Sequence, residues 1–159
     1  MSISFSGSEL INIAIGVEKR GIAFYDTMVK STRNTEARKV FQSLTDMERQ
    51  HIQIFQNMLA EADKYQMPDA YAAEYTTYLQ ALVDSAVFTD DFITSEMATR
   101  VGSDIEAIEL GISAEKDSIL FYYEMKEIMP KRAQLTVNKI LAEEKSHLRL
   151  LSELKKKLK

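Results

Sequence analysis

The two histidines of this chain each stand three residues after a glutamate, in the segments Glu48-Arg-Gln-His51 and Glu144-Lys-Ser-His147. Residues i and i+3 lie on the same face of a helix, so each pair can direct a carboxylate and an imidazole at one point. Carboxylate and imidazole groups are ligands for divalent metal ions. A single Glu-x-x-His is more often an ordinary surface pair, but two copies that use every histidine favour a metal site.

One further glutamate precedes each pair at nearly the same distance, Glu18 in the first half of the chain and Glu115 in the second. Four glutamates and two histidines are the ligands by which a four-helix bundle can hold two iron or manganese ions. The absence of thiolate ligands favours iron or manganese over a structural zinc. The candidate metal ligands are Glu18, Glu48, His51, Glu115, Glu144 and His147.

All six candidates interrupt stripes of apolar residues, so a helical fold must bury them. Glu18, for example, shares a stripe with Ala14, Gly21, Tyr25 and Met28. A buried carboxylate without a partner is strongly unfavourable, and four of them in one core repel each other. Two divalent cations would neutralise the four charges. The pattern therefore predicts a dimetal centre in the core of the protein.

The elements that must position these residues are four long helices. Five glycines and two prolines in 159 residues favour long helices over short strands and turns. Ser6 and Glu9 match a capping box, Asn34 can cap a second helix, Pro68 closes it, and Pro130 separates the last two. We predict an all-α protein with helices at about 8–30, 35–66, 104–129 and 131–157.

A crossover of residues 67–102 joins the second helix to the third. An unstructured loop of this length would be unusual in a compact domain, so we expect one or two additional helices that pack on the bundle. Its aromatic and apolar residues include Tyr71, Tyr75, Tyr78, Leu79, Leu82, Val83, Val87, Phe88 and Phe92.

The two halves of the chain are related by an internal repeat. Residues 13–28 (IAIGVEKRGIAFYDTM) align with residues 110–125 (LGISAEKDSILFYYEM), and residues 44–55 (LTDMERQHIQIF) with residues 140–151 (ILAEEKSHLRLL). The first helical hairpin therefore reappears as the second. We expect one domain over residues 1–159, with pseudo-twofold symmetry and the ligands meeting at its axis.

Several neighbours of the ligands have two interpretations. Tyr25 and Tyr122 lie two turns beyond Glu18 and Glu115, where they either hydrogen bond with ligand carboxylates or serve as core tyrosines. Glu143 is expected to be an exposed glutamate, the alternative being that it orients a histidine. The eight methionines are interpreted as core residues, and no haem site is expected.

Composition limits the other functions. The chain has a net charge of −4, no cysteine, and no extended basic block that would indicate nucleic-acid binding. The absence of cysteine excludes disulfides and thiolate metal sites in this chain. The N-terminal residues do not resemble a signal peptide, and no apolar run reaches the roughly 20 residues of a membrane span. We expect a soluble cytoplasmic protein.

The segments Glu18-Lys-Arg-Gly-Ile-Ala-Phe-Tyr25 and Glu115-Lys-Asp-Ser-Ile-Leu-Phe-Tyr122, each followed by Glu-x-x-His, resemble those of rubrerythrin-like diiron proteins of the ferritin-like superfamily. The resemblance implies an antiparallel ferritin-like bundle and a non-haem diiron site formed by the six candidates. It also implies reduction of hydrogen peroxide, or of dioxygen, to water. The electrons would come from an external rubredoxin-like protein, because this chain has no cysteine for a rubredoxin iron site.

One position departs from the rubrerythrin pattern. Rubrerythrins carry an extra glutamate one helical turn after the ligand on the third bundle helix, where this chain has Ser118. The remaining four glutamates and two histidines resemble the ligand set of bacterioferritin-type ferroxidase sites. Ferroxidase and iron-storage activity, a manganese catalase and a metal-binding protein without turnover therefore remain alternatives. We expect a homodimer.

Overall fold

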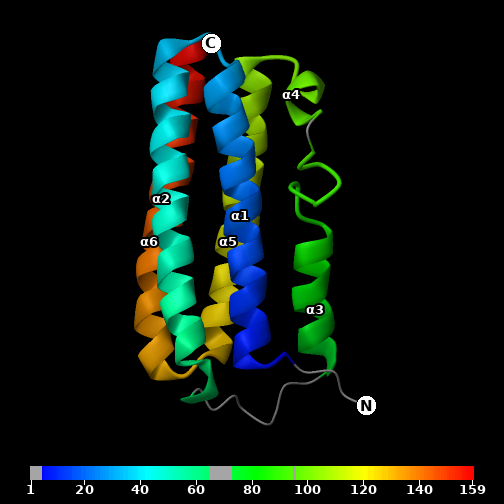
Figure 1. Ribbon diagram of the computed structural model, residues 1–159, viewed down its shortest axis with the longest axis vertical. Coiled ribbons are helices and arrows are strands. Elements are labelled where there is room, and N and C mark those ends of the chain that lie inside the picture. The colour runs from blue at the N-terminus through cyan, green and yellow to red at the C-terminus, as the bar shows by residue number, and fades with distance from the viewer. Residues whose placement is uncertain (1–4, 65–72, 95) are drawn as a thin grey trace.

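Four long helices form an antiparallel bundle in the computed structural model, which describes residues 5–64, 73–94 and 96–159. They are α1 (Gly7–Ser31), α2 (Thr35–Ala60), α5 (Asp104–Ile128) and α6 (Lys131–Leu158). Helix α1 pairs with α2, and α5 pairs with α6 (Figure 1). The described residues contain no strand. The predicted all-α, ferritin-like architecture is confirmed.

The starts of the helices follow the capping signals of the sequence. The Ser6 side chain accepts from the Glu9 N–H (3.1 Å), and the Glu9 carboxylate accepts from the Ser6 N–H (2.6 Å). Asn34 Oδ1 accepts from the Ala37 N–H at 2.9 Å, and the Ser103 side chain caps α5 in the same way. Each contact satisfies a backbone N–H that has no partner within the helix.

Helix α2 is shorter than predicted. We expected a helix over residues 35–66, but α2 ends at Ala60 and a 3₁₀ turn, η1 (Ala62–Lys64), follows. The apolar stripe of α2 ends at Met58, and Ala62 is the last buried residue in this region. Glu61, Asp63 and Lys64 are charged, so Ala62 is the one residue of this turn with an apolar side chain to bury.

The crossover contains two helices, α3 (Ala73–Asp84) and α4 (Met97–Arg100), which confirms the expectation of additional helices. They lie beside α1 and α5, on the side away from α2 and α6 (Figure 1). Pro68, Tyr71 and the side chain of Tyr75 are outside the part of the chain that the structure describes.

Polar contacts attach the crossover to the bundle. The Val87 N–H donates to Asp117 Oδ2 on α5 at 2.9 Å, and Arg20 on α1 forms an ion pair with Asp90 at 3.3 Å. Between these contacts, the Phe88 side chain is buried. The crossover therefore covers the face formed by α1 and α5.

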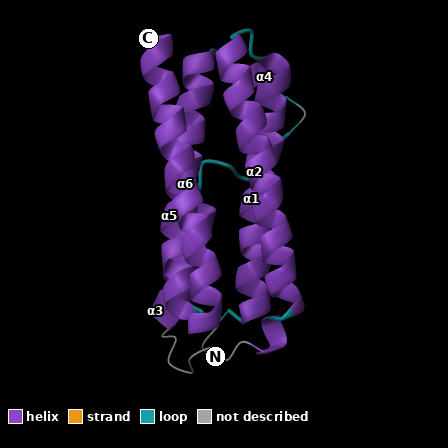
Figure 2. Cartoon of the chain, turned by 90° about the vertical axis from the view of Figure 1, so that its left-hand side faces the viewer, coloured by secondary structure: helices purple, strands orange, loops and turns teal. Residues whose placement is uncertain are grey.

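The core consists of two apolar clusters, one toward each end of the bundle. Figure 2 shows the bundle itself, turned by 90° from Figure 1. Members of the first cluster include Leu10, Ile11, Phe55, Met125 and Val137, and members of the second cluster include Phe24, Phe41, Leu44, Ile108 and Leu154. The six candidate ligands fall between these groups along each helix, so a polar layer divides the core. None of the described helices is both long enough and apolar enough to cross a membrane.

Two buried glycines provide a test of this packing. A Cβ at Gly111 would approach Leu151 Cδ1 to 3.1 Å and the ring of Tyr25 to 3.3 Å, whereas a Cβ at Gly21 would meet nothing within 4 Å. We expect Gly111→Ala to lower the free energy of unfolding by about 1–3 kcal/mol, because two buried side chains, Leu151 and Tyr25, would have to shift to admit the methyl group. Gly21→Ala should raise it by about 0.5–1 kcal/mol through helix propensity. Urea denaturation of the metal-free proteins measures both effects, and equal stabilisation by both substitutions would contradict the packing described.

Candidate metal centre

The bundle brings all six candidate residues together at mid-length. Each is at most 4% exposed. Helix α1 contributes Glu18, α2 contributes Glu48 and His51, α5 contributes Glu115, and α6 contributes Glu144 and His147. Four helices thus supply one or two side chains each to a single polar layer.

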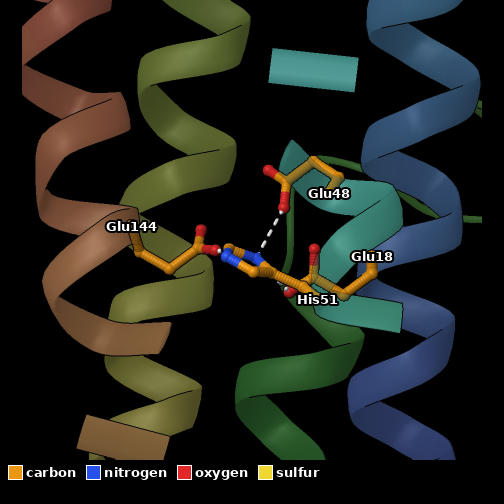
Figure 3. A group of neighbouring side chains, drawn as sticks. All are labelled: Glu18, Glu48, His51 and Glu144. Atoms are coloured by element: carbon orange, nitrogen blue, oxygen red, sulfur yellow. Dashed lines mark hydrogen bonds and ion pairs between the residues drawn. The ribbon is translucent and has the colours of Figure 1, made fainter. Parts of the chain in front are cut away.

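Three carboxylates surround the first histidine. His51 Nδ1 lies 2.9 Å from Glu144 Oε1, 3.0 Å from Glu48 Oε2 and 3.5 Å from Glu18 Oε1. Figure 3 shows these four side chains converging from α1, α2 and α6. We call them the His51 group.

The second histidine has an equivalent environment. His147 Nδ1 lies 3.5 Å from Glu48 Oε1, 3.6 Å from Glu115 Oε2 and 4.0 Å from Glu144 Oε2. These four residues form the His147 group. In each group, one potential ligand atom per residue can be chosen so that all lie within 4.8 Å of one another. Glu48 and Glu144 belong to both groups, as carboxylates that bridge two ions would.

Buried atoms without hydrogen bonds test whether metal ions fit this centre. Among the described side chains, the buried nitrogen and oxygen atoms that lack a hydrogen-bond partner are Glu115 Oε2, Glu144 Oε1 and His147 Nδ1. All three belong to the six candidates. An unsatisfied buried polar atom is costly, and a cation between these atoms would satisfy them. Carboxylate oxygens and imidazole nitrogens suit iron or manganese, so the six residues fit a centre of these metal ions.

The electrostatics of the carboxylates indicate the same need for positive charge. Burial and the charge of Glu48 raise the pKa of Glu18 well above its usual value. Burial also raises the pKa of Glu144, assisted by the charges of Glu48 and Glu115. Burial acts in the same direction on Glu48, but hydrogen bonds with Glu18 and both histidines outweigh it and hold the pKa of Glu48 below its usual range. Without a metal, protons must therefore offset part of the negative charge.

The pKa values of both histidines are raised, although burial alone would lower them. Burial by itself would lower the pKa of His51, but the surrounding carboxylates, Glu144 foremost, raise it. The same competition raises the pKa of His147 to about 9, through Glu115 and Glu48. The position beside each Nδ1 is therefore suited to a cation. Metal binding there would displace protons.

The two tyrosines hydrogen bond with carboxylates across the bundle. The Tyr25 hydroxyl on α1 donates to Glu115 Oε1 on α5 at 2.6 Å, and the Tyr122 hydroxyl on α5 donates to Glu18 Oε1 on α1. Burial and the charge of the accepting glutamate raise the pKa of both tyrosines, so the hydroxyls keep their protons. Each tyrosine thus fixes the orientation of a carboxylate that belongs to only one group.

The expectation that Glu143 is simply an exposed glutamate is incomplete. Its side chain is 50% exposed, yet Glu143 Oε2 lies 2.6 Å from His51 Nε2. At the corresponding place, Met47 Sδ lies 2.9 Å from His147 Nε2, a contact that the sequence analysis missed. The signal that could have revealed it is the residue immediately before each Glu-x-x-His, since that residue lies beside the ligands in both halves of the repeat.

A cavity of about 40 Å³ adjoins the centre between α1, α5 and the crossover. Three of the carboxylates, Glu18, Glu48 and Glu115, line it together with Gly21 and Ser118. Gly21 and Ser118 occupy equivalent positions in the two halves of the repeat. Both are small, so neither blocks the approach to the carboxylates.

Ser118 supplies no ligand to the centre. Its hydroxyl donates to the carbonyl of Ala114, one turn earlier on α5, at 3.1 Å. The place of the extra rubrerythrin glutamate is therefore occupied by part of the cavity wall.

Comparison with known proteins agrees with this geometry. A family profile described as Rubrerythrin matches residues 9–155. This chain belongs to the rubrerythrin family. Its family membership and its buried glutamate–histidine cluster identify a metal-binding protein of the diiron type. The use of the six residues as ligands remains a prediction.

The wider comparisons bear on the fold of this rubrerythrin-family chain. The crystal structure of a DUF305 fragment from Deinococcus radiodurans is similar, with a TM-score of 0.65, 11% identity and coverage of 99% of both chains. At this identity the likeness extends to the fold alone. No protein with a curated description matches the chain.

Removal of one shared carboxylate tests whether the cluster binds metal. Addition of Mn²⁺ at about 100 times its Kd should stabilise the metal-free wild type by about 2.7 kcal/mol, which corresponds to roughly 5–10 °C in Tm. Glu144→Gln should lose most of this increase, because the amide cannot bridge two cations. Glu153→Gln, on the exposed face of α6, should keep it. Differential scanning calorimetry with and without Mn²⁺ measures the shift. An equal shift in Glu144→Gln and wild type would show that the cation binds elsewhere.

Proposed function

We propose that this rubrerythrin-family protein is a non-haem diiron oxidoreductase that reduces hydrogen peroxide, or dioxygen, with electrons from an external donor protein. The observation that supports it most directly is the cavity, because three carboxylates of the cluster form part of its wall. A metal site for structure alone has no need for such a cavity. The proposal assigns two iron ions to the His51 and His147 groups.

The chemistry matches the number of metal ions. Reduction of one hydrogen peroxide molecule to two water molecules consumes two electrons and two protons, and two ferrous ions supply one electron each when bound. The residues of this chain hold the ligands in place. Tyr25 and Tyr122 orient the carboxylates of Glu115 and Glu18, while Glu48 and Glu144 lie between the two histidines.

The size of the cavity favours a small oxidant. A cavity of about 40 Å³ has room for roughly three water-sized molecules, which is enough for hydrogen peroxide or dioxygen. Half-buried Arg20 and Asp117 also line it, so its wall extends from the buried carboxylates toward the crossover.

Oxidation kinetics test the proposed substrate. We expect the protein loaded anaerobically with two Fe²⁺ per chain to be oxidised at least tenfold faster by hydrogen peroxide than by dioxygen at equal concentration. Stopped-flow absorption of the ferric product measures both rates. Rapid oxidation by dioxygen with slow oxidation by peroxide would instead support ferroxidase chemistry, and no oxidation by either would support a metal-binding role without turnover.

Substitution of Gly21 tests the cavity as the approach to the centre. Because a Cβ at this position points into open space, a leucine can fill the cavity without displacing the helix. We expect Gly21→Leu to slow peroxide oxidation by about tenfold or more and to leave the amount of bound Fe²⁺ unchanged. Asn12→Leu is the control on α1, because Asn12 is exposed and does not line the cavity. Equal rates in Gly21→Leu and wild type would exclude this route.

Ferroxidase and iron-storage activity is the alternative that Ser118 favours, because the remaining four glutamates and two histidines suffice for that chemistry. In that case iron is the substrate and leaves the centre after oxidation. Size-exclusion chromatography after iron loading distinguishes the two, since storage requires a cage of many subunits. The proposed peroxidase is a homodimer.

The identity of the metal and the electron donor belong to the same proposal. Metal analysis of protein produced without added metal should find iron, whereas manganese would favour a catalase.

The proposed donor is a rubredoxin-like protein, because the absence of cysteine leaves this chain without an iron–thiolate centre of its own. A reduced rubredoxin should restore the ferrous state after each turnover. The absorption change of rubredoxin as it becomes oxidised measures this electron transfer.

A further inference from the structure

The residues that contact Nε2 of the two histidines differ between the two halves of the repeat. When the first Glu-x-x-His is aligned with the second, Met47 is equivalent to Glu143. Each residue immediately precedes a shared carboxylate, and each contacts the histidine of the opposite hairpin. The ligands themselves are equivalent in type, but their supports are a thioether in one case and a carboxylate in the other.

Glu143 reaches from α6 to His51 on α2. The distance of 2.6 Å between Glu143 Oε2 and His51 Nε2 is that of a strong, charge-assisted hydrogen bond. A carboxylate only accepts, so Nε2 carries a hydrogen. A cation bound in the His51 group would displace the proton that Nδ1 shares with Glu48 and Glu144, and the lone pair of Nδ1 would then be free to bind it.

Met47 occupies the same place beside His147. Met47 Sδ lies 2.9 Å from His147 Nε2, with the methionine half-buried on α2. A thioether sulfur is a weak acceptor without a charge. It therefore contributes much less than a carboxylate to the orientation and basicity of the imidazole.

We propose that Glu143 makes the His51 group the tighter of two unequal metal sites, and that Met47 leaves the His147 group as the weaker one. A hydrogen bond from a ligating histidine to a carboxylate fixes the ring and raises its basicity, and its loss typically costs about 10–100-fold in metal affinity. The first divalent cation to bind occupies the His51 group. Glu143 and Met47 are positioning residues, since each acts through a histidine. This inference rests on the proposed dimetal centre.

The two histidines make the test direct, because the chain has no others to crowd a spectrum. Zn²⁺ is added stepwise to the ¹⁵N-labelled metal-free protein, and the ring nitrogens are followed by NMR, with assignments from single-histidine variants. At one Zn²⁺ per chain, we expect the Nδ1 signal of His51 to report the bound form and that of His147 the free form. The expected ratio of occupancies is about tenfold or more. In the bound form, the Nε2 hydrogen of His51 should exchange slowly with solvent.

Three variants separate the proposal from a general structural effect. Glu143→Gln should reduce the difference between the sites to less than about threefold. The exchange variant Met47→Glu/Glu143→Met should reverse the order of filling, a gain that a damaged fold cannot produce. Glu153→Gln, exposed on the same helix, should behave as wild type.

Two results would overturn the inference. If both histidines reach the bound form together in the wild type, or if the exchange variant keeps the original order, the sites are not ranked by these residues, although the dimetal centre stands. If neither histidine responds to Zn²⁺, the inference and the proposed dimetal centre fail together.

Discussion

Four carboxylates lie in the middle of an apolar bundle, and the helices can pack around them only if their negative charge is neutralised. The polar layer interrupts the core at the point where each long helix would otherwise bury only apolar side chains. Protons and the two imidazoles offset part of the charge, but they leave Glu115 Oε2, Glu144 Oε1 and His147 Nδ1 without a hydrogen-bond partner. Divalent cations answer both needs. Stability and metal binding are therefore coupled in this protein.

The pseudo-twofold arrangement explains how one short chain builds such a centre. Each hairpin contributes one Glu-x-x-His and one single glutamate, and the two glutamates that belong to both groups, Glu48 and Glu144, lie on the helices that carry the histidines. The hydroxyl of each tyrosine donates to a glutamate of the other hairpin, Tyr25 to Glu115 and Tyr122 to Glu18, so each half of the repeat orients a candidate ligand of the other. The equivalence of the two halves does not extend to the residues that contact the histidines, which are Glu143 in one half and Met47 in the other. This difference is the basis of the proposed difference in metal affinity between the two groups.

Residue type and spacing were sufficient to predict the four bundle helices and the convergence of the six polar residues. Both follow from helical periodicity, from caps at Ser6 and Asn34, and from the energetic need to partner buried charges. The early end of α2 was not predictable, because the first proline or glycine after Ala60 is Pro68, and no stop signal stands at the place where the helix ends. The contact of Glu143 with His51 and the cavity beside Gly21 depend on how far apart the helices pack, which local patterns do not encode.

The most direct test of the central claim is the location of the metal ions themselves. Crystals of the iron-loaded protein, measured at and below the iron absorption edge, give an anomalous difference map that depends on no assumed mechanism. We predict two peaks per chain, one beside His51 Nδ1 and one beside His147 Nδ1, with Glu48 and Glu144 between them. Peaks only at surface carboxylates, or none within the polar layer, would contradict it.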